Sequence, residues 1–255
     1  MSRDRASGMA PPYGSDPAAD RQVAAALAGS AAASAAVSPV DTEPLPPASL
    51  AWRWVVGTHA LDLHAVEPDH PQWRVTCLGA GEALHRARVA LAAEGFSAHV
   101  TLLPGDEPAH LARLVSAGPV AVTPQALALY AATDPSSTVD STDRPSTVEI
   151  RRGLRRELAG VAHNEGVRLR LIRVGGDLAG VLHGPDTRAG WLRAGAALSA
   201  VRLTCVRYGL RLTTTLPGPS SGVGGRAGRR RLSDREGWLG VGIGTPYARL
   251  RISPR

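Results

Sequence analysis

The feature that most constrains the fold of this chain is an internal repeat. Shifting the sequence by 114 positions aligns residues 77–102 with residues 191–216 without a gap, and nine of the 26 aligned positions are identical. The period is far longer than the roughly 20–50 residues of solenoid repeats. We therefore expect a duplicated half-domain, whose two copies face each other as the subunits of a dimer do. The identities in the first copy are Leu78, Ala80, Gly81, Ala83, Leu84, Arg88, Gly95, Thr101 and Leu102.

Apolar periodicity gives each copy the same order of elements. Period-two alternation predicts strand pairs at residues 52–56 with 61–65 and at residues 167–174 with 178–183. Each pair precedes a helix that ends at a glycine, Gly95 or Gly209, and a strand follows that glycine. The small residues Gly81 and Gly195 would let the two helices approach closely. The expected helices and strands of these copies are helix 77–94, strand 98–103, helix 148–164, helix 191–208 and strand 210–216.

The regions outside the aligned segments are less regular. Residues 1–46 contain a polar tail, an alanine-rich helix at 21–36 that needs a partner surface, and the start of a proline-rich connector. Between the copies we expect a helix at 108–116, a strand at 120–122 and a helix at 124–132. The predicted organisation is an α+β fold with a first half-domain at 47–133, a linker at 134–146, and a second half-domain at 147–255 that contains a Gly/Arg-rich loop at 218–236.

Charge is concentrated at the C-terminal end. The formal net charge is +7, and residues 201–255 hold eleven arginines against two acids, Asp234 and Glu236. Such a segment can attract polyanions. Aromatic residues make up only 4% of the chain, so few are available to stack on bases and we do not expect nucleic acid as a partner. The loop lacks the Lys-Ser/Thr ending of a phosphate-binding loop, so we interpret it as a linker.

Several classes of site and location are not expected. Cys77 and Cys205 are too few for a disulfide framework, and both fall in apolar helical segments where a thiol acts as a small hydrophobe. The histidines near Asp62 lack zinc-ligand spacing, so we expect no metal site. No uninterrupted apolar stretch is long enough to cross a membrane. The expected location is the cytoplasm.

Two motifs give the chain a family resemblance. Ala51-Trp-Arg-Trp with its hairpin, and Trp191-Leu-Arg-Ala-Gly-Ala-Ala-Leu-Ser-Ala with Gly209-Leu210, resemble the actinobacterial, dormancy-associated Acg-like branch of the nitroreductase superfamily. Thr142-Asp-Arg-Pro145 fits the arginine-containing stretch that opens the second half in that family. The match covers about residues 50–216, as in a truncated and divergent member. The resemblance implies a nitroreductase-like fold in which two fused halves form an internal pseudo-dimer.

The resemblance also implies a cofactor and its site. Family members bind FMN between the halves and pass hydride from NAD(P)H to a small-molecule acceptor such as a nitroaromatic or a quinone; the flavin does the redox chemistry. No catalytic side chain is implied. The chain would be a monomer that acts as a fused dimer, or a homodimer. Carried over residue by residue, the cofactor-binding positions would be Arg144 and Arg251 at the phosphate, Ser199 on the central helix, Thr215 and Leu216 beside the ring, and Trp52 near it.

The sequence also departs from that family. The Ser-x-His-Asn-x-Gln-Pro-Trp run that precedes the first strand in the family corresponds here to Leu45-Pro-Pro-Ala-Ser-Leu-Ala-Trp52, in which only the tryptophan is kept. Two alternatives to an FMN-dependent oxidoreductase therefore stay open. One is a non-catalytic flavin-binding or interaction protein on the same scaffold, and the other is an arginine-rich binder of polyanions.

Overall fold

The structure is a computed structural model that describes residues 17–35, 52–134, 147–174, 177–216 and 245–254. It is a mixed α+β fold with two four-stranded antiparallel sheets. The first sheet has the order β1-β2-β4-β3 and the second has the order β5-β6-β8-β7. The strands are β1 (Trp52–Val56), β2 (Ala60–Ala65), β3 (Phe96–Leu102), β4 (His110–Pro119), β5 (Arg168–Val174), β6 (Asp177–Gly184), β7 (Leu210–Thr215) and β8 (Thr245–Pro254). The helices are α1 (Pro17–Ala35), α2 (Trp73–Ala93), α3 (Pro124–Ala131), α4 (Thr147–Asn164) and α5 (Arg188–Arg207).

The two sheets agree in register as well as in order. A register shift interrupts the pairing of β2 with β4 between Leu63 and His64, and a shift at the corresponding place interrupts β6 and β8 between Leu182 and His183. Each irregularity lies next to the end of an inner strand, where a bulge bends the strand. The sequence alignment contains neither of these inner strand pairs, so the similarity of the two copies extends beyond it.

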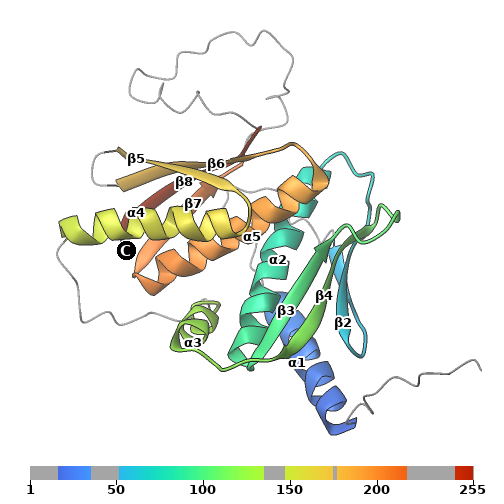
Figure 1. Cartoon of the computed structure of the whole chain (residues 1–255). Helices are drawn as coiled ribbons and strands as arrows, with labels where there is room; N and C mark the ends of the chain where they lie inside the picture. Colours follow the sequence, from blue (N-terminus) through green and yellow to red (C-terminus); the bar gives the residue numbers. More distant parts are fainter. Residues whose placement is uncertain (1–16, 36–51, 135–146, 175–176, 217–244, 255) are drawn as a thin grey trace, which may run out of the picture.

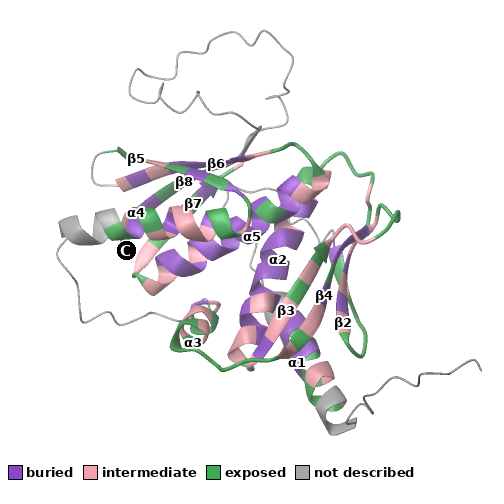
Figure 2. Ribbon diagram, viewed as in Figure 1, coloured by how far each residue is buried: buried purple, intermediate pink, exposed green. Residues whose placement is uncertain are grey.

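Helices α2 and α5 lie against each other in the centre of the molecule, with the first sheet on one side and the second sheet on the other (Figure 1). Both helices are largely alanine, leucine and glycine on the buried side. The inward residues of both sheets join them in one hydrophobic cluster, so that buried positions follow the helix pair and the facing side of each sheet (Figure 2). Burial of apolar surface along this shared layer is the main source of stability.

The two central helices end in the same way, as the sequence predicts. Gly95 follows α2 with a φ of 81°, and Gly209 follows α5 with a φ of 65°. A left-handed residue at this position ends a helix, and glycine adopts it without a Cβ penalty. The chain then enters β3 or β7. These two predicted helix ends are confirmed.

Two predictions between the copies are wrong. The segment expected to form a helix at 108–116 contains β4, and residues 120–122 are not a strand. The leucines at 111 and 114 are spaced as on a helix face, but β4 fills the position between β2 and β3 and pairs with both. Long-range pairing therefore outweighs the local pattern. The strand continues to Pro119, which leaves residues 120–122 as the connection to α3.

The helices outside the central pair also find partners. The alanine-rich α1 packs on α2, where Leu27 is fully buried, so it has the partner surface that its thin apolar face requires. Helix α4 packs on α5 and β5. The short helix α3, capped by Thr123, contacts both α2 and α5, and a small cluster there joins Val89 and Leu203. Among the described helices, none is long and apolar enough to cross a membrane.

Candidate functional site

The centre of the α2–α5 interface is a backbone-to-backbone contact made by two glycines of the repeat. A Cβ built on Gly81 would lie 1.9 Å from the carbonyl oxygen of Leu192, and a Cβ built on Gly195 would lie 1.9 Å from that of Leu78. Gly81 and Gly195 are 114 positions apart, as are Leu78 and Leu192, so each helix touches the other in the same manner. At this crossing the helices leave no space for a ligand between them.

Ser199, a predicted cofactor residue, lies inside this interface. Its hydroxyl is 3.0 Å from Nδ1 of His85, the residue at the equivalent position of α2, and both residues are buried. Burial, together with the positive charges of Arg88 and Arg86, lowers the pKa of His85 to about 3, so the ring is neutral at ordinary pH. A serine and a histidine could act as a nucleophile and a base. This pair, however, is buried between the helices, and no carboxylate among the described residues is hydrogen-bonded to the His85 ring. We interpret it as a polar link between the helices.

This neutral histidine makes stability depend on pH. The folded-state pKa lies below the unfolded-state value of about 6.5. The stabilisation is therefore complete above pH 6.5 and decreases as the pH falls toward 3. We expect unfolding at pH 5 to require about 2 kcal/mol less than at pH 7 because of His85. Chemical denaturation of the wild type and of His85→Asn would show this as a shallower pH dependence in the variant; equal slopes would contradict it.

Charged side chains surround the buried pair on the same helices. Glu82 of α2 and Arg202 of α5 form an ion pair at 2.9 Å, and Arg88 pairs with Glu165 at 2.8 Å. Arg86 is 8% exposed, its Nε has no hydrogen-bond partner among the described residues, and burial lowers its pKa. The interface therefore contains more positive than negative groups around Glu82.

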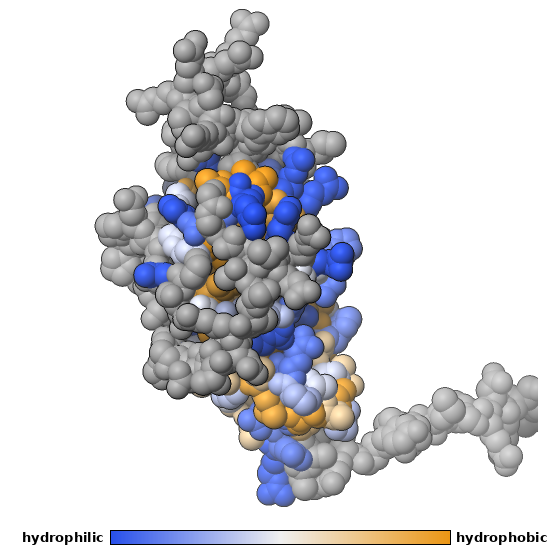
Figure 3. Space-filling model, turned by 90° about the vertical axis from the view of Figure 1, so that its left-hand side faces the viewer, coloured by the Kyte–Doolittle hydropathy of each residue, from blue (hydrophilic) through white to orange (hydrophobic). Residues whose placement is uncertain are grey.

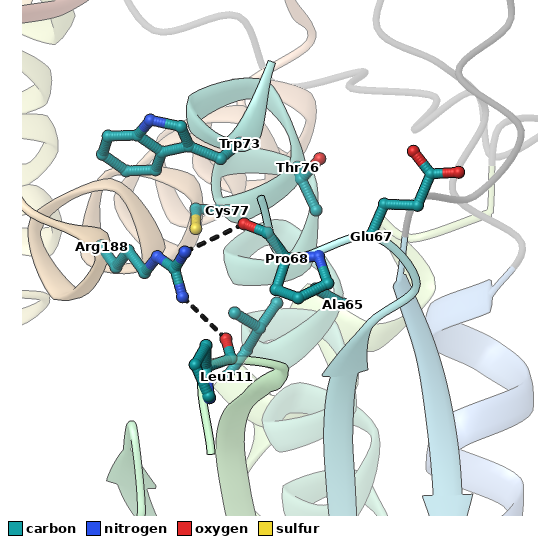
Figure 4. Close-up of a pocket in the computed structure, with 9 residues that line it drawn as sticks. Ala65, Glu67, Pro68, Trp73, Thr76, Cys77, Leu111 and Arg188 are labelled. Atoms are coloured by element: carbon teal, nitrogen blue, oxygen red, sulfur yellow. Dashed lines mark hydrogen bonds between the residues drawn. The ribbon is translucent and has the colours of Figure 1, made fainter. Parts of the chain in front are cut away.

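The N-terminal ends of the two helices are joined by arginines at equivalent positions of the repeat. Arg74 of α2 binds Asp186 just before α5, and Arg188 of α5 donates to the carbonyl oxygens of Pro68 and Pro108 (Figure 4). The guanidinium of Arg188 lies beside a pocket of about 10 Å³, which has room for about one water molecule. This end of the interface is fastened by charge-assisted hydrogen bonds and offers no ligand-sized cavity.

A different surface, the outer side of the second sheet, is rich in arginine. We call it the basic face and define it by Arg168 and Arg170 on β5, Arg211, Thr213 and Thr215 on β7, and Arg249 and Arg251 on β8. Leucine, alanine and isoleucine alternate with these residues and belong to the hydrophobic cluster below. On the side of the molecule in Figure 3, hydrophilic side chains border an apolar area near the top, at the level where Figure 1 places this sheet.

Strand register shows how the basic face differs from the first sheet. On the first sheet, Arg113 lies between Asp62 and Thr101 in neighbouring strands. At the equivalent place of the second sheet, Arg249 lies between Val181 and Thr215. A valine thus replaces the carboxylate.

The consequence is electrostatic. Asp62 accepts from Arg113 at 2.7 and 3.1 Å and from His110 at 2.8 Å, and these bonds lower the pKa of its carboxyl group. On the basic face, Asp177 pairs with Arg251, while within the described chain Arg168 and Arg249 are exposed and have no carboxylate partner. Asp62 thus neutralises Arg113 on the first sheet, while Arg168 and Arg249 add positive charge to the basic face that no described carboxylate balances.

An open cleft of about 440 Å³ adjoins the start of β5. It is lined by the end of α4, which contributes Ala159 and His163, and by residues 166–169. Arg168 belongs to both the cleft and the basic face. The volume is in the range of small-molecule sites.

The structure separates the predicted cofactor residues into three groups. Thr215 and Arg251 share the basic face, and the half-buried Leu216 follows β7 at its edge. Ser199 is enclosed between the central helices. Trp52 is buried on the first sheet with its indole nitrogen against Gly79. Arg144 and the Gly/Arg-rich loop lie outside the described residues, and the described residues contain no cluster able to hold a metal ion.

Sequence reasoning missed Arg168, Arg170 and Arg249 as members of one surface. The signal was the same short pattern, Arg-Leu-Arg, at 168–170 and at 249–251. Period-two alternation places both arginines of each pattern on one side of a strand. What the pattern could not show is that the two strands lie in one sheet, separated by β6 alone.

Comparison with known proteins adds no relative to this description: no protein-family model and no curated protein matches the chain.

Proposed function

We propose that this chain is a non-catalytic binding protein, built as an internal pseudo-dimer, that holds an anionic, phosphate-bearing ligand on its basic face. The observation that carries the proposal is the replacement of Asp62 by Val181 at the equivalent place of the second sheet, so that no described carboxylate pairs with Arg249 as Asp62 pairs with Arg113. Planar guanidinium groups bind phosphate through paired N–H donors. The hydroxyls of Thr213 and Thr215 lie in the same rows and can add hydrogen bonds.

The contacts between α2 and α5 support this assignment, because they give the interface a structural role. Reciprocal contacts at Gly81 and Gly195, the buried His85–Ser199 pair and the arginines at the helix ends all serve to hold the two copies together. A flavin between α2 and α5 at the glycine crossing would require the helices to separate. We therefore assign a structural role to the interface between α2 and α5, and ligand binding to the outer surface of the second sheet.

Calorimetric titration with tripolyphosphate tests the proposal. We expect the Arg168→Ala/Arg249→Ala variant to bind at least about fivefold more weakly, which is about 1 kcal/mol for solvent-exposed charge contacts. Arg113→Ala is the matched control, because Arg113 occupies the position equivalent to Arg249 but is already bound by Asp62. An equal loss in both variants, or no binding by the wild type to any phosphate-bearing probe, would overturn the function.

An FMN-dependent oxidoreductase is the second candidate, favoured by the position of Thr215 and Arg251 on one face. In this case the FMN phosphate would contact Arg144, with Arg251 as the second phosphate residue, and NAD(P)H would supply hydride to the flavin. Titration of the protein with FMN, followed by the visible flavin spectrum, tests binding. Bleaching of bound flavin by NADH or NADPH then separates an oxidoreductase from a flavin-binding protein without turnover.

A further inference from the structure

We propose that the ligand of the basic face is nucleic acid, held through its phosphate backbone. This inference rests on the proposed function. It differs from the expectation drawn from the sequence, because aromatic content and the arginines of the C-terminal segment do not show which arginines share one face of a sheet. Its evidence is the spacing of the arginines and the chemistry of their neighbours.

The arginines are spread over an area larger than one phosphate group can cover. Arg249 and Arg251 are two residues apart on β8, which separates their Cα atoms by about 6.8 Å. Arg170 lies in the same cross-strand row as Arg249, with Val181 between them, at about 9.6 Å. A mononucleotide could reach two or three of these groups. A ligand with phosphates repeated along its length can reach all of them.

The neighbours of these arginines also favour a backbone over a protein partner. Protein interfaces depend on apolar and aromatic anchors near their centre. Here one central row holds Arg170, Arg249 and Thr215 beside the buried Val181. The next row holds Arg251 and Thr213 beside Ile172 and Ala179, and neither row contains an aromatic residue. Arginine and threonine side chains are typical donors to phosphate oxygens, and such contacts position a nucleic acid without reading its bases.

Fluorescence anisotropy with a labelled 20-base-pair DNA duplex, and with one strand of it, tests the inference on the full chain. We expect binding that weakens steeply between 50 and 200 mM salt. Arg168→Ala/Arg249→Ala should reduce affinity by at least about tenfold and lower the slope of log K against log salt by about two. Arg113→Ala should leave both quantities unchanged, and circular dichroism confirms that each variant is folded.

The outcomes separate the inference from the function on which it rests. Binding of tripolyphosphate or FMN without binding of DNA would overturn the nucleic-acid assignment and leave the phosphate-binding function standing. Failure of every phosphate-bearing probe would overturn both. DNA binding that survives Arg168→Ala/Arg249→Ala unchanged, or that polyglutamate displaces as effectively as unlabelled DNA at equal charge, would also overturn the assignment of nucleic acid to this face.

Discussion

Replacing Gly81 with alanine is expected to lower the free energy of unfolding by about 3–5 kcal/mol, or to prevent folding. The added Cβ would meet the carbonyl oxygen of Leu192 at 1.9 Å and the backbone nitrogen of Ala196 at 3.0 Å. Both are backbone atoms of α5, so no side chain can rotate away. The helices must move apart along the layer that buries most of the core, and each methylene left uncovered there loses stabilisation.

Gly160→Ala is the matched control for this substitution. Gly160 lies in α4, and a Cβ built on it meets nothing within 4 Å. Alanine there should stabilise the protein by about 0.5–1 kcal/mol because it restricts the unfolded chain and has a higher helix propensity. Denaturant unfolding of the two variants and the wild type measures both effects. A loss at Gly81 no larger than about 1 kcal/mol would show that the helices do not meet at this residue.

The central pair of helices was the part of the fold most accessible to sequence reasoning. Two local signals carried this prediction. The identical residues Gly81 and Gly195 indicate a close approach of the helices. The glycines that end the helices, Gly95 and Gly209, indicate a left-handed backbone. The structure bears out both. Element ends were less accurate, since α2 begins at Trp73 and α5 at Arg188, several residues before the expected starts.

Strand β4 shows where this reasoning failed. Its leucines at 111 and 114 fit a helical spacing, and the information that overrides it lies outside this segment, in the strands β2 and β3 with which it pairs. The same limit applies to the basic face. Alternation predicts that Arg249 and Arg251 point the same way, but only the sheet order places them on one face with Arg170 and leaves Val181 where the first sheet has Asp62.

The predicted cofactor residues illustrate a related limit. A family resemblance assigns a residue by its position in the sequence, but it does not show what surrounds that residue in this chain. Ser199 lies on the central helix as expected, yet His85 occupies the space beside it. Thr215 and Arg251 remain available on the surface, which is why they contribute to the proposal and Ser199 does not.

Replacing Glu82 with glutamine is the second substitution expected to have a large effect, a loss of about 3–5 kcal/mol. The Glu82 side chain is 2% exposed and is bound to Arg202, which is 17% exposed. Arg86 lies nearby, and the charge of Glu82 favours its protonated form. Removing the one carboxylate leaves two cations in a region where solvent cannot compensate them.

Asp186→Asn provides the comparison, because Asp186 and Arg74 form an ion pair with side chains 31% and 46% exposed. Solvent screens that pair, so its loss should cost no more than about 1 kcal/mol. The double variant Glu82→Gln/Arg202→Gln should regain part of the stability lost in Glu82→Gln, since it removes one of the two stranded cations. Thermal and denaturant unfolding of the three variants tests this reasoning. If Glu82→Gln costs no more than Asp186→Asn, then Glu82 does not neutralise the arginines between α2 and α5, and the positive excess assigned to that interface would have to be held by another group.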